Sequence, residues 1–182
     1  MPYAVELALD PTSADAIQRA WRELDEAGIT WMAHSGARPH VSLGIWDLLD
    51  RDAAESELTE VAAVTAPVRL TLASVGLFPG VAVFLAPTVT AELLDLHAGF
   101  HRRFDRLGGG SWDHYRPGTW VPHCTLATDM EPDQFGTALA IAGRVSLPLE
   151  CRVGEVGIVE FRPVKQLVSR VLGGPRRAGA QT

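Results

Sequence analysis

The sequence predicts an α+β domain in which helices cover the outer faces of antiparallel sheet. Segments with the strand period of two alternate with segments with the helical period of 3.6, and the last part of the chain contains consecutive strands with no helix between them. The interior contains no stretch rich in Gly, Ser and Pro that would mark a linker between independent domains. We therefore expect residues 1–172 to form one domain and residues 173–182 to form a flexible, Gly-rich C-terminal tail.

The first half of the chain predicts strands and helices in turn. Apolar and polar residues alternate at the N-terminus, as in a half-buried strand. Pro11, Thr12 and Ser13 are typical of a helix start, and Gly28 is typical of a helix end. Pro67 stops a second helix, because proline breaks the helical hydrogen-bond ladder. The predicted elements are a strand over 3–9, a helix that ends at Gly28, a strand over 38–46 and a helix over 50–66.

The second half predicts a hairpin, a long helix and a final group of strands. Two β-prone runs are separated by Phe78, Pro79 and Gly80, which favours a hairpin. The segment 108–118 is rich in glycine, polar and aromatic residues and is predicted as a loop. The predicted elements are strands over 68–77 and 81–86, a helix over 88–107, a strand over 123–128, a short helix over 132–142, and two or three strands within 147–172.

The composition is that of an ordinary soluble globular protein. Hydrophobic residues make up 47% of the chain and charged residues 21%, and no apolar run is long enough to cross a bilayer. The N-terminus lacks the basic, apolar and small-residue pattern of a signal peptide, so we expect a cytoplasmic protein without membrane contact. Cys124 and Cys151 lack the spacing of a zinc site and are predicted to be core residues.

The net charge restricts the class of partner. At −6, the chain does not predict an extended nucleic-acid footprint, since binding along a nucleic acid normally requires a basic face. A small nucleotide or an RNA end remains possible as a substrate. The sequence does not indicate an oligomeric state.

A short motif occurs twice in the chain. Pro39-His40-Val41-Ser42-Leu43 is repeated as Pro122-His123-Cys124-Thr125-Leu126. On a strand, residues two apart share a face, so His40 lies beside Ser42 and His123 lies beside Thr125. The residues between them, Val41 and Leu43 in one copy and Cys124 and Leu126 in the other, are expected to be buried on the opposite face. Two such strands could line one cleft.

The repeated imidazole and hydroxyl pair predicts acid and base catalysis on a phosphoester. Imidazole has an ordinary pKa near 6.5, so one copy can be neutral and the other charged at cellular pH. The neutral histidine would take a proton from the attacking group and the charged one would give a proton to the leaving oxygen. The hydroxyls of Ser42 and Thr125 would donate hydrogen bonds to the phosphate oxygens. This scheme requires neither a metal nor a cofactor.

The paired His-x-Ser/Thr motifs, each between proline and leucine, resemble those of the 2H phosphoesterase superfamily, in its branch of 2'-5' RNA ligase-like proteins and cyclic phosphodiesterases. The resemblance covers roughly residues 2–172. It implies two pseudo-symmetric lobes of antiparallel sheet and outer helices around a central cleft, with His40 and His123 as the catalytic pair and Ser42 and Thr125 as phosphate-binding residues. Ser42 stands where the family more often has threonine, which keeps the hydroxyl.

Further candidates have structural alternatives. Tyr115, Arg116 and Trp120 precede the second motif and could stack on a base or bind a second phosphate, or the aromatic residues could simply hold the loop to the core. Arg38, beside the first motif, is a weaker substrate-binding candidate. His97 and His101 are four residues apart on a predicted helix, but the glutamate of a zinc-protease helix is missing between them, so we do not predict a metal site.

Three functions are consistent with these residues. The first is hydrolysis of a cyclic phosphodiester, such as a nucleoside 2',3'-cyclic phosphate, by His40 and His123. The second is the joining of RNA ends through a 2'-5' linkage, for which the same histidines would serve in reverse. The third is a module that binds a nucleotide or an RNA end without useful turnover. The sequence does not decide which histidine is the acid.

Overall fold

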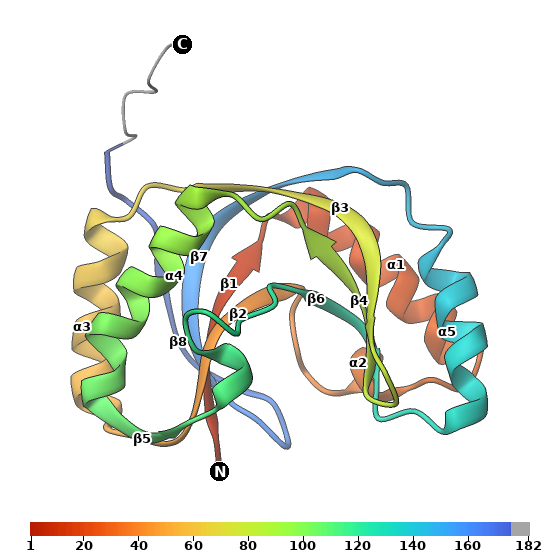
Figure 1. Ribbon diagram of the computed structural model, residues 1–182, viewed down its shortest axis with the longest axis horizontal. Coiled ribbons are helices and arrows are strands. Elements are labelled where there is room, and N and C mark those ends of the chain that lie inside the picture. Colours follow the sequence, from red (N-terminus) through yellow and green to blue (C-terminus); the bar gives the residue numbers. More distant parts are fainter. Residues whose placement is uncertain (176–182) are drawn as a thin grey trace.

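The computed structural model describes residues 1–175, and its strands form one antiparallel sheet flanked by helices (Figure 1). The predicted α+β class is confirmed. The elements are β1 (Tyr3–Leu9), α1 (Pro11–Glu26), α2 (Trp31–His34), β2 (His40–Leu49), α3 (Arg51–Val64), β3 (Val68–Phe78), β4 (Ala82–Pro87), α4 (Ala91–Phe104), η1 (Asp105–Leu107), β5 (Gly108–Ser111), η2 (Asp113–Tyr115), β6 (Cys124–Thr128), η3 (Pro132–Gln134), α5 (Phe135–Ala142), β7 (Leu149–Glu160) and β8 (Lys165–Val171).

The long strand β7 joins the two halves of the sheet. The strand order is β5-β2-β1-β7-β3-β4-β6, and β8 also pairs with β7. The first residues of β7 pair with β3, whereas its later residues pair with β1 and β8. In Figure 1, α3 and α4 flank one half of the sheet and α1 and α5 flank the other. The described strands thus form a single connected sheet, and the pseudo-symmetry of two lobes stays a prediction.

Two short elements differ from the sequence prediction. The segment predicted as a loop begins with β5, which pairs with the end of β2. A Cβ atom on Gly108 would collide with the carbonyl oxygen of Leu48, so the close approach of these strands needs glycine. The glycines that suggested a loop therefore allow an edge strand. The helix α2 is one turn long and was not predicted.

The core explains which face of each motif strand is buried. Val41 and Leu43 in β2, and Cys124 and Leu126 in β6, are all at most 1% exposed. This confirms the prediction that these residues face away from the solvent. Cys151 is also buried, so both cysteines are core residues as predicted.

The predicted C-terminal tail is described only at its start. Gly173 and Gly174 donate backbone hydrogen bonds to the carbonyl oxygens of Ala62 and Thr65. Residues 176–182 lie outside the described residues. Within residues 1–175, no helix has both the length and the apolar character needed to cross a bilayer.

Candidate active site

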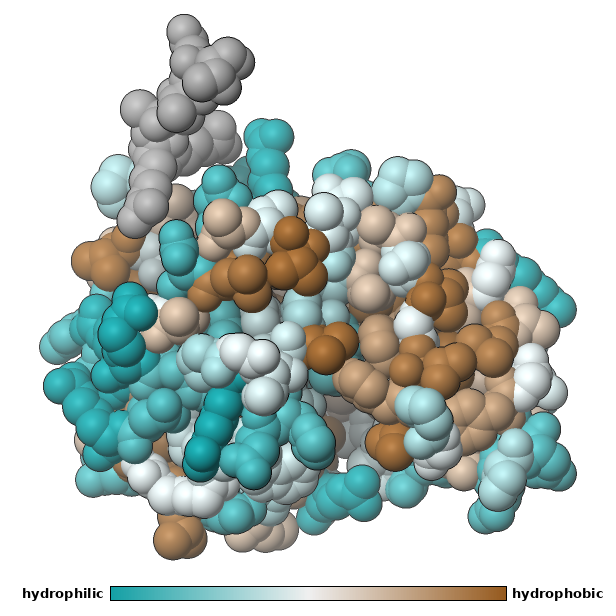
Figure 2. Space-filling model, viewed as in Figure 1, coloured by the Kyte–Doolittle hydropathy of each residue, from teal (hydrophilic) through white to brown (hydrophobic). Residues whose placement is uncertain are grey.

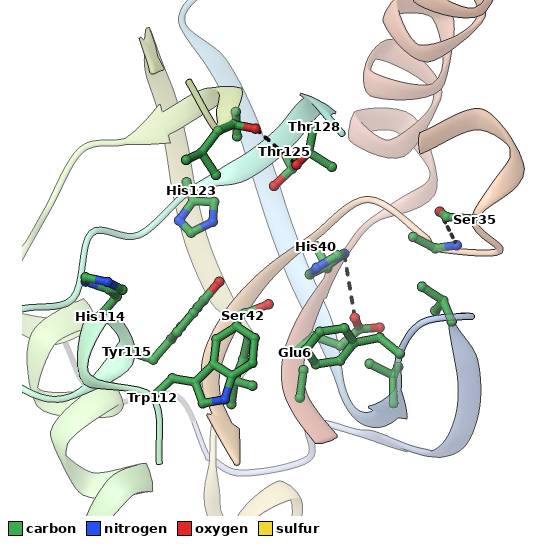
Figure 3. A pocket seen from close by; sticks show the side chains of 18 of the residues that line it. Glu6, Ser35, His40, Ser42, Trp112, His114, Tyr115, His123, Thr125 and Thr128 are labelled. Atoms are coloured by element: carbon green, nitrogen blue, oxygen red, sulfur yellow. Dashed lines mark hydrogen bonds and ion pairs between the residues drawn. The ribbon is translucent and has the colours of Figure 1, made fainter. Parts of the chain in front are cut away.

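A cavity of about 560 Å³ lies where the two motif strands approach each other. Its walls come from β1, β2, β6, the tip of the β3–β4 hairpin, α2, η2 and the turn between β7 and β8. The four motif residues His40, Ser42, His123 and Thr125 all line it (Figure 3). The fold therefore brings together two segments that are 83 residues apart in the sequence. The hairpin contributes the apolar residues Phe78, Val81 and Ala82 to the lining, and Figure 2 shows apolar residues gathered over this half of the molecule.

The two histidines are held in the same way. His40 Nδ1 lies 2.6 Å from the carbonyl oxygen of Arg38, and His123 Nδ1 lies 2.7 Å from that of Val121. In both cases the carbonyl belongs to the residue two positions earlier. Because a carbonyl oxygen only accepts hydrogen bonds, each Nδ1 must carry the proton. Each imidazole is thereby left with Nε2 as the nitrogen that can exchange a proton with a ligand.

A β-bulge follows the hydroxyl residue in both motifs. Glu6 of β1 faces Ser42, but the next residue of β1 toward the N-terminus faces Gly44, so Leu43 has no partner. The pairing of β4 with β6 skips Leu126 in the same manner, directly after Thr125. A bulge shifts the alternation of side chains by one residue. As a result, Ile45 and Thr128 line the cavity three positions after the motif hydroxyls, where simple alternation would place them on the opposite face.

A tryptophan supports each motif from behind. The indole Nε1 of Trp120 donates to the carbonyl oxygen of Ser42 at 3.1 Å. Trp21, from α1, donates to the carbonyl oxygen of Thr125, also at 3.1 Å. Both tryptophans are buried, and they satisfy carbonyl groups of two strands next to the cavity. The two half-sites therefore match in histidine tautomer, bulge position and carbonyl donor.

The surroundings of the two imidazoles differ. His123 lies among aromatic rings, with ring centroids 5.0 Å from Phe78, 5.2 Å from Phe84 and 6.1 Å from Tyr115. Burial lowers the pKa of His123, and the charge of His40 adds to this effect. His40 instead faces a carboxylate, with Nδ1 3.6 Å from Oε2 of Glu6 (Figure 3).

Two further groups in or beside the cavity remain protonated at neutral pH. Burial raises the pKa of Tyr115 to about 12, so its phenol can donate a hydrogen bond. Its side chain extends from η2 toward His123 (Figure 3). Burial also raises the pKa of Cys124, behind the cavity wall, to about 12. This thiol is therefore not a nucleophile.

One of the four predicted substrate-binding residues lines the cavity, and the other three contact neighbouring protein groups. Tyr115 lines the cavity, whereas Arg38, Arg116 and Trp120 do not. Arg38 is paired with Glu6 and Glu155, and Trp120 stacks on His97 with ring centroids 3.9 Å apart. Arg116 forms an ion pair with its neighbour Asp113, a contact local to η2.

The structure adds cavity residues that the sequence did not single out as site residues. Glu6, Trp112 and His114 line the cavity, as do Phe161 and Arg162 of the turn between β7 and β8. Glu6 lies in β1, which the alternation of apolar and polar residues predicted to be half-buried. The structure instead buries residues 4–9 on both faces, so the polar side chain of Glu6 lies inside rather than in solvent. The turn is more than thirty residues from either motif, and nothing in its sequence placed it at the site.

His97 and His101 are structural residues whose hydrogen bonds attach α4 to neighbouring segments. His101 contacts the carboxylate of Asp105 through Nδ1 and the carbonyl oxygen of Leu43 through Nε2, each at 3.0 Å. His97 Nε2 donates to the carbonyl oxygen of Tyr115 at 2.9 Å. Among residues 1–175, no group of three or more His, Cys, Asp or Glu side chains is arranged to hold a metal ion.

Comparison with known proteins identifies the family. The sequence model of the 2'-5' RNA ligase superfamily matches residues 9–164, which is most of the chain. The chain belongs to this superfamily. Membership supports an enzyme that acts on a phosphodiester or processes RNA ends. No curated protein sequence matches the chain.

Several solved structures share the fold. TT0787 of Thermus thermophilus is 21% identical, with a TM-score of 0.64, and the match covers 97% of this chain and 100% of that protein. Escherichia coli LigT complexed with NADP+ is 18% identical, with a TM-score of 0.55 over 93% of this chain and 96% of LigT. LigT complexed with 3'-AMP gives 17% identity and a TM-score of 0.54 over the same shares.

Proposed function

We propose that the protein hydrolyses a cyclic phosphodiester, such as a nucleoside 2',3'-cyclic phosphate, with His40 and His123 as the acid and base. The observation that supports this most strongly is the pair of matched half-sites around one cavity. Each half-site offers Nε2 of an imidazole and a hydroxyl group from the same face of a strand. One imidazole takes a proton from water as its oxygen attacks phosphorus, and the other protonates the leaving ribose oxygen.

The remaining cavity groups suit a small nucleotide. Ser42, Thr125 and the phenol of Tyr115 are available to donate hydrogen bonds to the phosphate oxygens. Trp112 and Phe161, in edge contact with ring centroids 5.9 Å apart, offer apolar surface for a base. Arg162 is the one Lys or Arg side chain that lines the cavity within the described part of the chain. This charge pattern favours a substrate with a single phosphate over an RNA strand, and complexes of LigT with 3'-AMP and NADP+ are consistent with nucleotide binding.

Hydrolysis is tested with nucleoside 2',3'-cyclic phosphates after treatment of the protein with excess chelator. We expect turnover by the wild-type chain and a loss of at least about 100-fold in kcat for His40→Ala and for His123→Ala. The matched control is His34→Ala, because His34 lies on the exposed side of α2 and pairs with Asp25. Full activity of either motif variant would overturn the proposed roles, and no turnover of any cyclic phosphate would overturn the activity.

RNA end joining is the second candidate, favoured by the description of the superfamily itself. The same two histidines would catalyse it with the 5'-hydroxyl of the second RNA half in place of water: one takes the proton of that hydroxyl as its oxygen attacks phosphorus, and the other protonates the leaving ribose oxygen. Incubation with RNA halves that end in a cyclic phosphate and a 5'-hydroxyl separates the two activities. A joined product with a 2'-5' linkage supports ligation, and a free terminal phosphate supports hydrolysis. Binding without either product would support the nucleotide-binding module.

A further inference from the structure

The turn between β7 and β8 brings one positive charge to the opening of the cavity. Arg162 is exposed and lines the cavity of about 560 Å³ together with the motif residues. The one carboxylate in the lining formed by the described residues, Glu6, is offset by its ion pair with Arg38. Arg162 is therefore the cation that an anionic substrate meets in this cavity.

The guanidinium of Arg162 rests on an aromatic ring rather than on a carboxylate. Within residues 1–175 it belongs to none of the ion pairs. Its central carbon lies 5.5 Å from the ring centroid of Trp31, another residue of the cavity lining. A cation–π contact at an exposed site is weaker than the charge-assisted hydrogen bonds between a guanidinium and a phosphate. An entering phosphate can therefore draw the guanidinium away from the indole.

The backbone of Arg162 also indicates that its side chain has a function. Its φ of 70° lies in the left-handed region, which bulky residues rarely adopt. Glycine would take this conformation without a steric cost, so the turn carries arginine at a cost in stability. Residues with such strained backbone are concentrated at functional sites.

The charges beside Arg162 direct an anion toward the histidines. A smaller cavity of about 430 Å³ shares Val81, Thr128 and Arg162 with the first. Its lining also includes Asp129 and Glu131, whose exposed carboxylates repel a phosphate on that side. On the other side of the guanidinium lies the cavity with the two motif hydroxyls, which donate hydrogen bonds. A phosphate bound by Arg162 is thus favoured on the side of the catalytic pair.

We propose that Arg162 is a substrate-binding residue that leaves Trp31 and pairs with the phosphate group of the substrate. This inference rests on the proposed hydrolysis. The chain has a net charge of −6, which repels an anionic substrate at long range, and a cation at the cavity opening raises the local concentration of that substrate. The cyclic diester carries one negative charge, whereas the monoester product carries about −1.5 to −2 at pH 7. Arg162 therefore binds the product more tightly than the substrate.

Arg162→Gln tests the inference, with Arg116→Gln as the matched control. The glutamine keeps a polar side chain but removes the charge, so KM for a nucleoside 2',3'-cyclic phosphate should rise about 10-fold while kcat falls no more than about twofold. The difference in KM should shrink at high salt, which screens an exposed charge. Arg116 pairs with Asp113 and does not line the cavity, so its variant should keep KM within about twofold. Arg162→Lys keeps the charge without the planar fork and should recover part of the loss.

Binding of a nucleoside 3'-monophosphate provides a test that does not depend on turnover. Tryptophan emission should change as the guanidinium leaves Trp31, and Trp31→Phe should lack this change. We expect the Kd of the monophosphate to rise at least about 10-fold in Arg162→Gln, a larger effect than that on KM.

The outcomes separate the inference from the proposed function. An unchanged Kd and an unchanged KM in Arg162→Gln would overturn the binding role of Arg162 while wild-type turnover still supports hydrolysis. No turnover of any cyclic phosphate by the wild-type chain, together with monophosphate binding that depends on Arg162, would remove the proposed hydrolysis and keep the binding role.

Discussion

At the scale of the residue, the repeated motif determines local geometry, and distant residues determine chemistry. Proline, histidine and a hydroxyl residue at fixed spacing give both copies the same tautomer and the same face of the strand. The shared face depends on neighbours along the chain, so the motif alone predicted it, whereas the common cleft of His40 and His123 was implied by the family resemblance. Glu6 and Phe84 come from other strands, so their places beside His40 and His123 could not be predicted from the motif.

The hydroxyls of the motifs provide a prediction at this scale. Ser42→Ala should lower kcat/KM for a cyclic phosphate by roughly 10- to 100-fold, because it removes one hydrogen bond to the phosphate oxygens. Ser42→Thr is the matched control, since it keeps the hydroxyl and resembles the second motif at Thr125. Steady-state kinetics compare the two variants. Equal activity of Ser42→Ala and the wild-type chain would show that this hydroxyl does not bind the phosphate.

At the scale of the element, each motif strand needs support that the sequence pattern does not show. Periodicity predicted most helices and strands, because the buried side of an element follows a regular spacing. It missed β5, where glycines permit close strand pairing, and it missed the bulges at Leu43 and Leu126, which depend on the partner strand. The role of Trp120 was open from the sequence, and the structure shows it behind β2 rather than in the cavity.

The tryptophan donors provide a prediction for these strands. Trp21→Phe should reduce the free energy of unfolding by about 1–3 kcal/mol, because the carbonyl oxygen of Thr125 loses its donor next to a buried strand. Trp120→Phe should cost at least as much, since it also changes the stack on His97. Urea unfolding measures both effects. Stabilities within about 0.5 kcal/mol of the wild-type value would show that these carbonyl groups find other partners.

At the scale of the whole molecule, α4 joins the loop before the second motif to the strand of the first. His101 contacts the backbone of β2, His97 contacts the backbone of η2, and Trp120 stacks on His97. Helical spacing predicted α4 but not this connection, because the partners lie on three separate segments. The network couples the position of Tyr115 in the cavity to the packing of a helix on the far side of β2.

This network makes the fold sensitive to acid. Burial lowers the pKa of His97 to about 4, with a further contribution from His101, whereas the unfolded chain has the ordinary value of about 6.5. Between these values the unfolded chain binds a proton that the folded chain refuses, so stability decreases as the pH falls below about 6.5. From pH 7 to pH 5 the loss from this group alone should be about 2 kcal/mol. The carboxylates of Asp10 and Glu57, whose pKa values are also lowered, lose their contribution at lower pH than this window.

Urea unfolding at pH 7 and pH 5 compares the wild-type chain with His97→Gln. The glutamine amide can donate to the carbonyl oxygen of Tyr115 but does not titrate, so the variant should lose about 2 kcal/mol less than the wild-type chain between the two pH values. His123, whose pKa is also lowered, adds the same slope to both proteins and cancels in the comparison. If both proteins lose stability equally, His97 takes up its proton without opening the contact between α4 and η2.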